Sequence, residues 1–139
     1  MLRVVLDPGV LIAAVVSGSG APAELLDRWR DGEFDLVVSP SLLNELEDVL
    51  LRPKFAGLAS DDEVRAYVEA LSAGGLAFVD PAEPPAVTSD PGDDYLVALA
   101  VTAGADAIVS GDQHLTELAD PPVPVLTPRE LVERLERPI

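Results

Sequence analysis

The apolar residues of this chain fall into short runs that alternate with stretches of helical periodicity. Short apolar runs bounded by polar residues, glycine or proline are typical of buried strands, and they predict strands over residues 2–6, 34–38, 76–79, 105–110 and 123–126. Between them, apolar residues recur on one helical face, which predicts helices over residues 10–16, 22–29, 41–51, 61–71 and 93–103. A final helix is expected after Thr127, because Thr127, Pro128 and Glu130 match a capping box with a first-turn proline.

The alternation of strand and helix predicts a three-layer α/β fold, in which a parallel sheet of about five strands is flanked by helices. The 139 residues suit one domain with one core, so we expect residues 1–139 to form it. Residues 80–90 hold three prolines and are predicted to be a loop, while Gly18 and Gly20 are expected to end the first helix.

Polar and helix-breaking residues interrupt the apolar run at the start of the chain. Asp7, Pro8 and Gly9 follow directly on residues 2–6, which fits neither a signal peptide nor a membrane span. The absence of cysteine excludes disulfides and thiolate metal sites. We therefore expect a cytoplasmic protein without membrane contact.

The chain is strongly acidic, with 25 acidic against 9 basic residues and a formal charge of −16. Such a charge repels nucleic acid at long range and is the main argument against a nucleic-acid substrate. Bound divalent cations would reverse the sign of an acidic site locally. Arg52 and Lys54 are weak candidates for contacts to RNA phosphates, since a role as solvated surface charges explains them equally well.

Four acidic residues occupy positions that an α/β fold would bring together. Asp7 and Asp112 follow predicted strands, and Glu45 and Asp94 lie on predicted helices. In an open parallel sheet, the carboxyl ends of the strands border the ligand crevice. Carboxylate oxygens suit hard divalent cations such as Mg²⁺ or Mn²⁺, so this pattern predicts metal-assisted chemistry on phosphates.

Structural roles explain the same acids taken singly. Asp7, Asp90 and Asp112 can each cap a helix or turn, and Glu45 can be one more solvated residue on a polar face. Glu45 and Glu47 flank the apolar stripe of their helix on opposite sides, so periodicity does not choose between them.

The order and spacing of these residues resemble the PIN-domain ribonucleases, and among them the small VapC-like toxins of bacterial toxin–antitoxin pairs. The resemblance covers essentially the whole chain and favours Glu45 over Glu47. Four segments carry it: Val4-Val5-Leu6-Asp7, Leu43-Asn44-Glu45-Leu46, Asp90-Pro91-Gly92-Asp93-Asp94 and Ile108-Val109-Ser110-Gly111-Asp112.

The resemblance implies a metal-dependent endoribonuclease that cleaves single-stranded RNA, as the toxin of a type II toxin–antitoxin pair. A cognate antitoxin would neutralise it, and a homodimer is expected. The implied catalytic ligands of one or two Mg²⁺ or Mn²⁺ ions are Asp7, Glu45, Asp94 and Asp112. Asp93 would be an auxiliary acid, and Ser110 would supply a hydroxyl to the site.

One departure from the family pattern leaves alternatives open. The family usually has Asp-Thr-Asn where this chain has Asp7-Pro8-Gly9, so a hydroxyl and an amide that would orient the acids are missing. One alternative is a catalytically weakened PIN domain that acts as a protein-interaction module. A weaker alternative is a phosphohydrolase of the haloacid dehalogenase type, which requires a second aspartate where this chain has Gly9.

Overall fold

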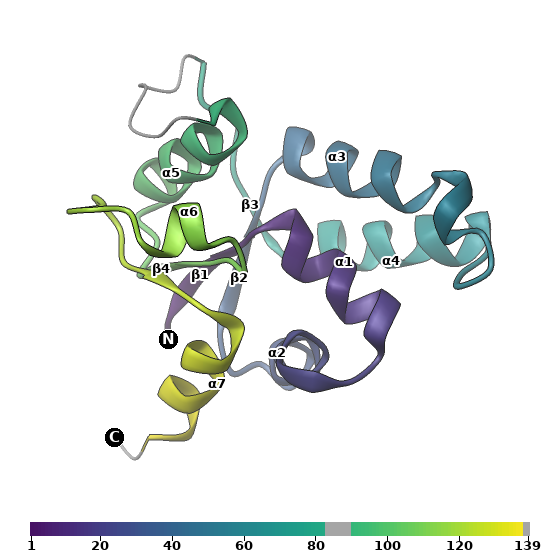
Figure 1. The fold of residues 1–139 in the computed structure, drawn as a ribbon, viewed down its shortest axis with the longest axis horizontal. Helices are drawn as coiled ribbons and strands as arrows, with labels where there is room; N and C mark the ends of the chain where they lie inside the picture. Colours follow the sequence, from purple (N-terminus) through teal and green to yellow (C-terminus); the bar gives the residue numbers. More distant parts are fainter. Residues whose placement is uncertain (83–89, 138–139) are drawn as a thin grey trace.

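The computed structural model describes residues 1–82 and 90–137. The five predicted strands form a single parallel sheet with the order β3-β2-β1-β4-β5, as expected from the sequence (Figure 1). The two edge strands are two residues long, shorter than predicted, because the apolar pattern extends past the residues that pair with the neighbouring strand. The strands are β1 (Arg3–Leu6), β2 (Asp35–Val38), β3 (Leu76–Ala77), β4 (Ala107–Val109) and β5 (Val125–Leu126).

The helices begin where polar side chains cap them. The caps of the first, third, fifth and seventh helices each precede a proline near the helix start, and each accepts a hydrogen bond from a first-turn backbone N–H. The predicted capping box of the last helix is confirmed. The helices are α1 (Pro8–Ser17), α2 (Gly20–Arg30), α3 (Pro40–Leu50), α4 (Asp61–Gly74), α5 (Pro91–Ala103), α6 (Gln113–Thr116) and α7 (Pro128–Glu136), with a 3-10 helix over Pro53–Phe55.

The two glycines after α1 have different roles in the structure. Gly18 ends α1 in a left-handed conformation with φ of 66°, as predicted, but Gly20 begins α2 instead of ending α1. The expected start of that helix at residue 22 is therefore two residues late. Of the loop predicted over residues 80–90, residues 83–89 lie outside the described part of the chain.

The helices lie on both sides of the central strands. In Figure 1, α5 lies on one side of β1 and β4, and α3 and α4 lie on the other. Contacts join α5 to β1 and β4, and α4 to β2. The strand residues Val5, Val37 and Ile108 are fully buried between these layers, as the apolar runs of the sequence predict.

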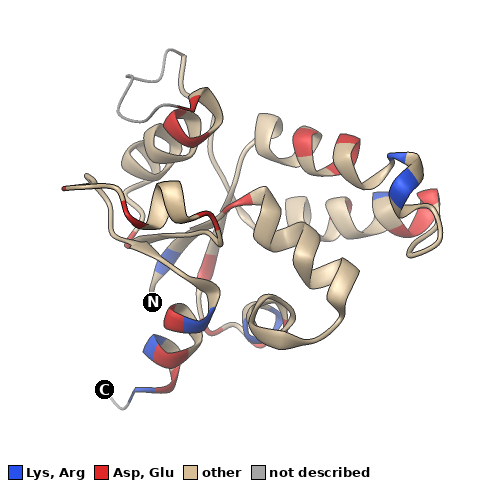
Figure 2. Cartoon of the chain, in the orientation of Figure 1, with Lys and Arg blue, Asp and Glu red and all other residues tan. Residues whose placement is uncertain are grey.

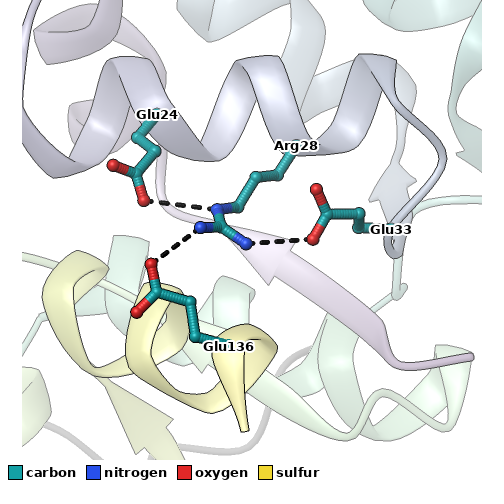
Figure 3. Close-up of polar contacts among 4 residues, drawn as sticks. All are labelled: Glu24, Arg28, Glu33 and Glu136. Carbon is teal, nitrogen blue, oxygen red and sulfur yellow. Dashed lines mark hydrogen bonds and ion pairs between the residues drawn. The ribbon is translucent and has the colours of Figure 1, made fainter. Parts of the chain in front are cut away.

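Ion pairs of one arginine connect the C-terminal helix to the rest of the domain. The guanidinium of Arg28 on α2 contacts Glu24 of its own helix at 3.2 Å, Glu33 at 3.0 Å and Glu136 of α7 at 2.8 Å (Figure 3). The third contact spans 108 residues of sequence. Arg28 therefore links the first half of the chain to its last helix.

Within the described residues, no single helix is long and apolar enough to cross a membrane. The pair α1 and α2 reaches the necessary length and composition only together, across a bend of 101°. The apolar residues Val10, Leu11 and Leu25 of this pair are buried in the core.

Candidate functional site

Two of the predicted acids, Asp7 and Asp112, lie where the sheet changes its winding direction. From β1 the chain proceeds to β2 and β3 on one side, whereas β4 and β5 lie on the other. In such sheets a crevice opens beyond the carboxyl ends of the two strands at the reversal. Asp7 follows β1 directly, and its backbone N–H donates to Val109 of β4 at 2.9 Å. The first predicted ligand therefore lies at the reversal point.

Both carboxylate oxygens of Asp7 accept hydrogen bonds. The backbone N–H of Gly9 donates to Oδ1 at 3.0 Å, which caps α1, and the hydroxyl of Ser110 donates to Oδ2 at 2.8 Å. Ser110 is fully buried, and its Oγ also accepts from the backbone N–H of Asp112 at 3.0 Å. One hydroxyl thus links the two strand-end acids and partly replaces the orientation that Pro8 and Gly9 cannot supply.

Asp112 begins the short helix α6. Its Oδ1 accepts from the backbone N–H of His114 at 2.9 Å and lies 3.2 Å from the Nδ1 of the same residue. The predicted turn cap is therefore present. The carboxylate is also partly exposed, with 44% of the side chain open to solvent. Capping and exposure to a ligand are compatible at this position.

Glu45 and Glu47 face different parts of the molecule. Burial and then the charges of Asp7 and Asp90 raise the pKa of Glu45, and Arg52 partly offsets this effect. The Oε1 of Glu47 lies 3.9 Å from the Nε of Arg65 on α4 instead. Glu45 therefore interacts electrostatically with the acids of the site, whereas Glu47 lies beside α4; the role of Glu45 as a ligand stays a prediction.

Negative charge is most crowded at Asp93. Asp93 and Asp94 are each only 8% exposed, in the first turn of α5. Burial, followed by charge repulsion, raises the pKa of Asp93 to about 6. The repelling charges, largest first, belong to Asp90, Asp112, Asp7 and Asp94. These acids come from three separate segments of the chain, so the fold has brought them together.

Two adjoining depressions open over these acids and share Asp112. One of about 440 Å³ is lined by Asp90, Pro91, Asp93, Asp112 and His114. The other, of about 410 Å³, is lined by residues that include Asp7, Gly9 and Asp112. Of the four predicted ligands, Asp7 and Asp112 line this surface directly, whereas Glu45 and Asp94 do not. Asp93, expected only as an auxiliary acid, lines it as well.

The oxygen donors of the acids suit a divalent cation, although their side chains do not form a complete coordination site. In residues 1–82 and 90–137, no three Asp, Glu or His side chains lie close enough together to hold one ion. Neighbouring carboxylates repel one another unless a cation lies between them. All donors present are hard oxygens, which Mg²⁺ and Mn²⁺ prefer. The chemistry of the donors therefore fits such an ion.

Charge is unevenly distributed around the site. Figure 2 shows acidic residues at the start of α1, on α3 and at the start of α5, with basic residues near the far end of α3. Arg52 is exposed there, and its charge partly offsets the rise in the pKa of Glu45. The ammonium of Lys54 lies 5.0 Å from the centre of the Phe55 ring. Contact of either residue with RNA stays a prediction.

Sequence reasoning foresaw Asp90 only as a cap, and it did not single out Tyr95. Asp90 caps α5 through the backbone N–H of Gly92 at 2.7 Å and also acts on Glu45 and Asp93. Tyr95 hydrogen-bonds Ser39 and Asp80, and burial with the bond to Asp80 raises its pKa to about 12. The position beside two acids in an apolar helix was a signal for Tyr95.

Other proteins share the sequence pattern or the fold of this chain. The chain is 27% identical to the uncharacterized protein MJ1680 of Methanocaldococcus jannaschii, over 98% of this chain and 93% of that protein. PAE2754 from Pyrobaculum aerophilum has a similar fold, with a TM-score of 0.67, 18% identity and coverage of 96% of this chain and 95% of that one.

A second solved structure is VapBC2 from Rickettsia felis, bound to a DNA fragment from the promoter. Its TM-score is 0.63 at 10% identity, over 91% of this chain and 98% of that one. At these identities the two solved structures show likeness of fold alone. Residues 3–114, which include every acid of the site, match the PIN domain family. The chain therefore belongs to the PIN domain family.

Proposed function

We propose that this protein is a metal-dependent endoribonuclease that cleaves single-stranded RNA. PIN domains are typically metal-dependent nucleases. The observation that carries the proposal is the crowding of negative charge at the reversal point of the sheet, where four neighbouring acids act on Asp93. Crowded carboxylates without a cation destabilise a fold, so a functional role for them is favoured over a structural one.

In this proposal, Asp7, Glu45, Asp94 and Asp112 hold one or two Mg²⁺ or Mn²⁺ ions. Such an ion supplies an activated water, a point of attachment for the scissile phosphate and compensation for charge on the leaving oxygen. Ser110 holds the Asp7 carboxylate in place through the bond at 2.8 Å. The partly exposed Asp112 lies at the open surface where a phosphate would approach.

The proposal extends to a biological role as the toxin of a type II pair. The likeness to a solved structure of VapBC2 supports a cognate antitoxin as partner. With a net charge of −16, long-range attraction of RNA is absent, and the exposed Arg52 is the proposed local contact for phosphates. Homodimer formation and a cytoplasmic location stay predictions of the same role.

The decisive experiment is cleavage of a mixed single-stranded RNA pool by the purified protein with Mg²⁺ or Mn²⁺. Asp7→Asn is the test variant, because asparagine keeps an oxygen to cap α1 but removes the charge. Asp62→Asn is the matched control, because this fully exposed side chain on α4 belongs to another surface. We expect cleavage by the wild type and Asp62→Asn, and none by Asp7→Asn or with EDTA. Equal cleavage by Asp7→Asn would contradict the proposal.

A second candidate function is supported by the departure at Pro8 and Gly9. A folded protein that binds Mn²⁺ but leaves every RNA intact would favour a protein-interaction module. Turnover of a small phosphate ester without RNA cleavage would favour a phosphohydrolase, although no observation on the described residues supports that chemistry.

A further inference from the structure

The phenol of Tyr95 joins three segments that meet beside the acidic site. Tyr95 lies on α5, directly after Asp94, and its hydroxyl hydrogen-bonds both the Ser39 hydroxyl and the Asp80 carboxylate. Ser39 follows β2 and caps α3, and Asp80 lies shortly after β3. Both carboxylate oxygens of Asp80 also accept from the backbone N–H of Ser41, each at 3.2 Å.

These bonds form a directed chain of donors. Tyr95 donates its only hydroxyl proton to Asp80, so the bond between the two hydroxyls must be donated by Ser39. The Oγ of Ser39 accepts in turn from the backbone N–H of Leu42 at 3.3 Å. Ser39 is buried, and no buried side-chain polar atom of the described residues lacks a partner. Loss of the phenol oxygen would remove one of the two side-chain partners of the buried Ser39 hydroxyl, the other being the Asp80 carboxylate.

These hydrogen bonds connect two helices that otherwise pack on different neighbours. α3 packs mainly against α4 and α1, whereas α5 packs against β1 and β4. Glu45 lies on α3 and Asp94 on α5, so these two acids approach the site from opposite elements. The hydrogen bonds of Tyr95 join a position just after the first turn of α5 to the residue that caps α3, and therefore fix the relative position of the two helix starts.

We propose that Tyr95 is a positioning residue, whose hydroxyl fixes the start of α3 against α5 and thereby sets the position of Glu45 relative to the acids at the start of α5. This inference rests on the proposed function, since it assigns Tyr95 a role at the same site. The hydroxyl touches neither the cation nor the RNA. It acts through the start of α3 and the first turn of α5, as partners beyond the direct ligands do in metal sites.

The test compares two tyrosine-to-phenylalanine variants by calorimetric titration of Mn²⁺. Tyr67→Phe is the matched control, because the Tyr67 hydroxyl also makes a tertiary hydrogen bond, to the backbone carbonyl of Leu11 at 3.0 Å, without joining α3 to α5. We expect Tyr95→Phe to weaken Mn²⁺ binding about tenfold, in the range found for partners beyond the direct ligands. Tyr67→Phe should bind Mn²⁺ as the wild type does, even where its melting temperature falls similarly.

A double-mutant cycle separates positioning from general loosening of the fold. Ser39→Ala breaks the same chain from the side of α3, so its combination with Tyr95→Phe should weaken Mn²⁺ binding less than the product of the two single effects. Wild-type affinity in Tyr95→Phe, an equal loss in Tyr67→Phe, or independent effects of Ser39→Ala would overturn the inference alone. A wild-type protein that binds no Mn²⁺ would overturn the proposed function and this inference with it.

Discussion

Asp93 is the residue at which the electrostatic cost of the site is most visible. Its pKa rises from 3.8 to about 6, first through burial and then through the charges of neighbouring acids. The folded protein therefore holds this proton more tightly than the unfolded chain does. Asp93 contributes stability below pH 4, and this contribution is lost as the pH rises through about 6.

A pH series on Asp93→Asn measures this contribution. In the presence of EDTA, the variant should melt a few degrees above the wild type at pH 8, because it lacks the buried charge. The difference should shrink toward zero near pH 4, where the wild-type carboxyl is protonated. Thermal unfolding followed by circular dichroism gives both values. A variant less stable than the wild type at pH 8 would show that the charge of Asp93 stabilises the fold.

The residues after Asp7 allow a second prediction at this scale. A side chain at position 9 meets only ordinary contacts, with the nearest atom, Asp7 Oδ1, 3.7 Å from an added Cβ. Pro8→Thr with Gly9→Asn should therefore fold and raise the rate of RNA cleavage, because both restore polar groups near the acids. Single-turnover kinetics would show the gain. An unchanged rate in a wild type that is already active would mean that Ser110 and the Gly9 N–H orient Asp7 sufficiently.

Individual residues of the site were only partly predictable from the sequence. Helical periodicity left Glu45 and Glu47 equivalent, and the structure separates them because Glu47 lies near Arg65 on a neighbouring helix. The bond from Ser110 to Asp7 spans 103 residues. Contacts of this kind depend on tertiary packing, which no local pattern encodes.

At the scale of elements, the close approach of α4, β2 and β3 leaves no room for a side chain at Gly75. A Cβ at this position would lie 2.6 Å from the carbonyl oxygen of Leu71 and 2.8 Å from a methyl group of Val38. Gly75 ends α4 immediately before β3, so it sets how the edge strand and the following Asp80 join the sheet. Glycine is required here because there is no room for a Cβ, and not for its backbone freedom, since any residue can adopt its φ of −81°.

Gly75→Ala should lower the free energy of unfolding by about 1–3 kcal/mol, the usual cost of forcing an extra group into a packed region. Gly57→Ala is the control, because an added Cβ at Gly57 meets nothing within 4 Å. The control should be neutral or slightly stabilising. Urea unfolding measures both. Equal stabilities of the two variants would mean that the α4–β3 turn relaxes without cost.

Elements with strong local signals were predicted best. Thr127, Pro128 and Glu130 gave both the start and the capping box of α7, and Asp7 was expected as a possible cap. The edge strand β3 was predicted too long because Phe78 and Val79 continue the apolar pattern after strand pairing has ended. Only the backbone N–H of Phe78 still bonds to β2, through Val38. Strand ends depend on the neighbouring strand as well as on composition.

For the whole molecule, the order of the sheet explains why distant acids converge. The parallel α/β class followed from alternation, but the reversal between β1 and β4 is a property of the complete topology. This reversal places Asp7 beside Ser110, which a linear pattern suggests only through family resemblance. The high negative charge, which argued against a nucleic-acid substrate, is concentrated in part at this same site (Figure 2).

The most direct test of the account is calorimetric titration of Mn²⁺ into the wild type, Asp112→Asn and Asp62→Asn. Both variants remove one charge from a chain of net charge −16, but only Asp112 borders the acidic depression. We predict binding by the wild type and Asp62→Asn, and a loss of about tenfold or more in affinity for Asp112→Asn. Equal Mn²⁺ affinity in all three proteins would show that the acids do not form one cation site and would contradict the account.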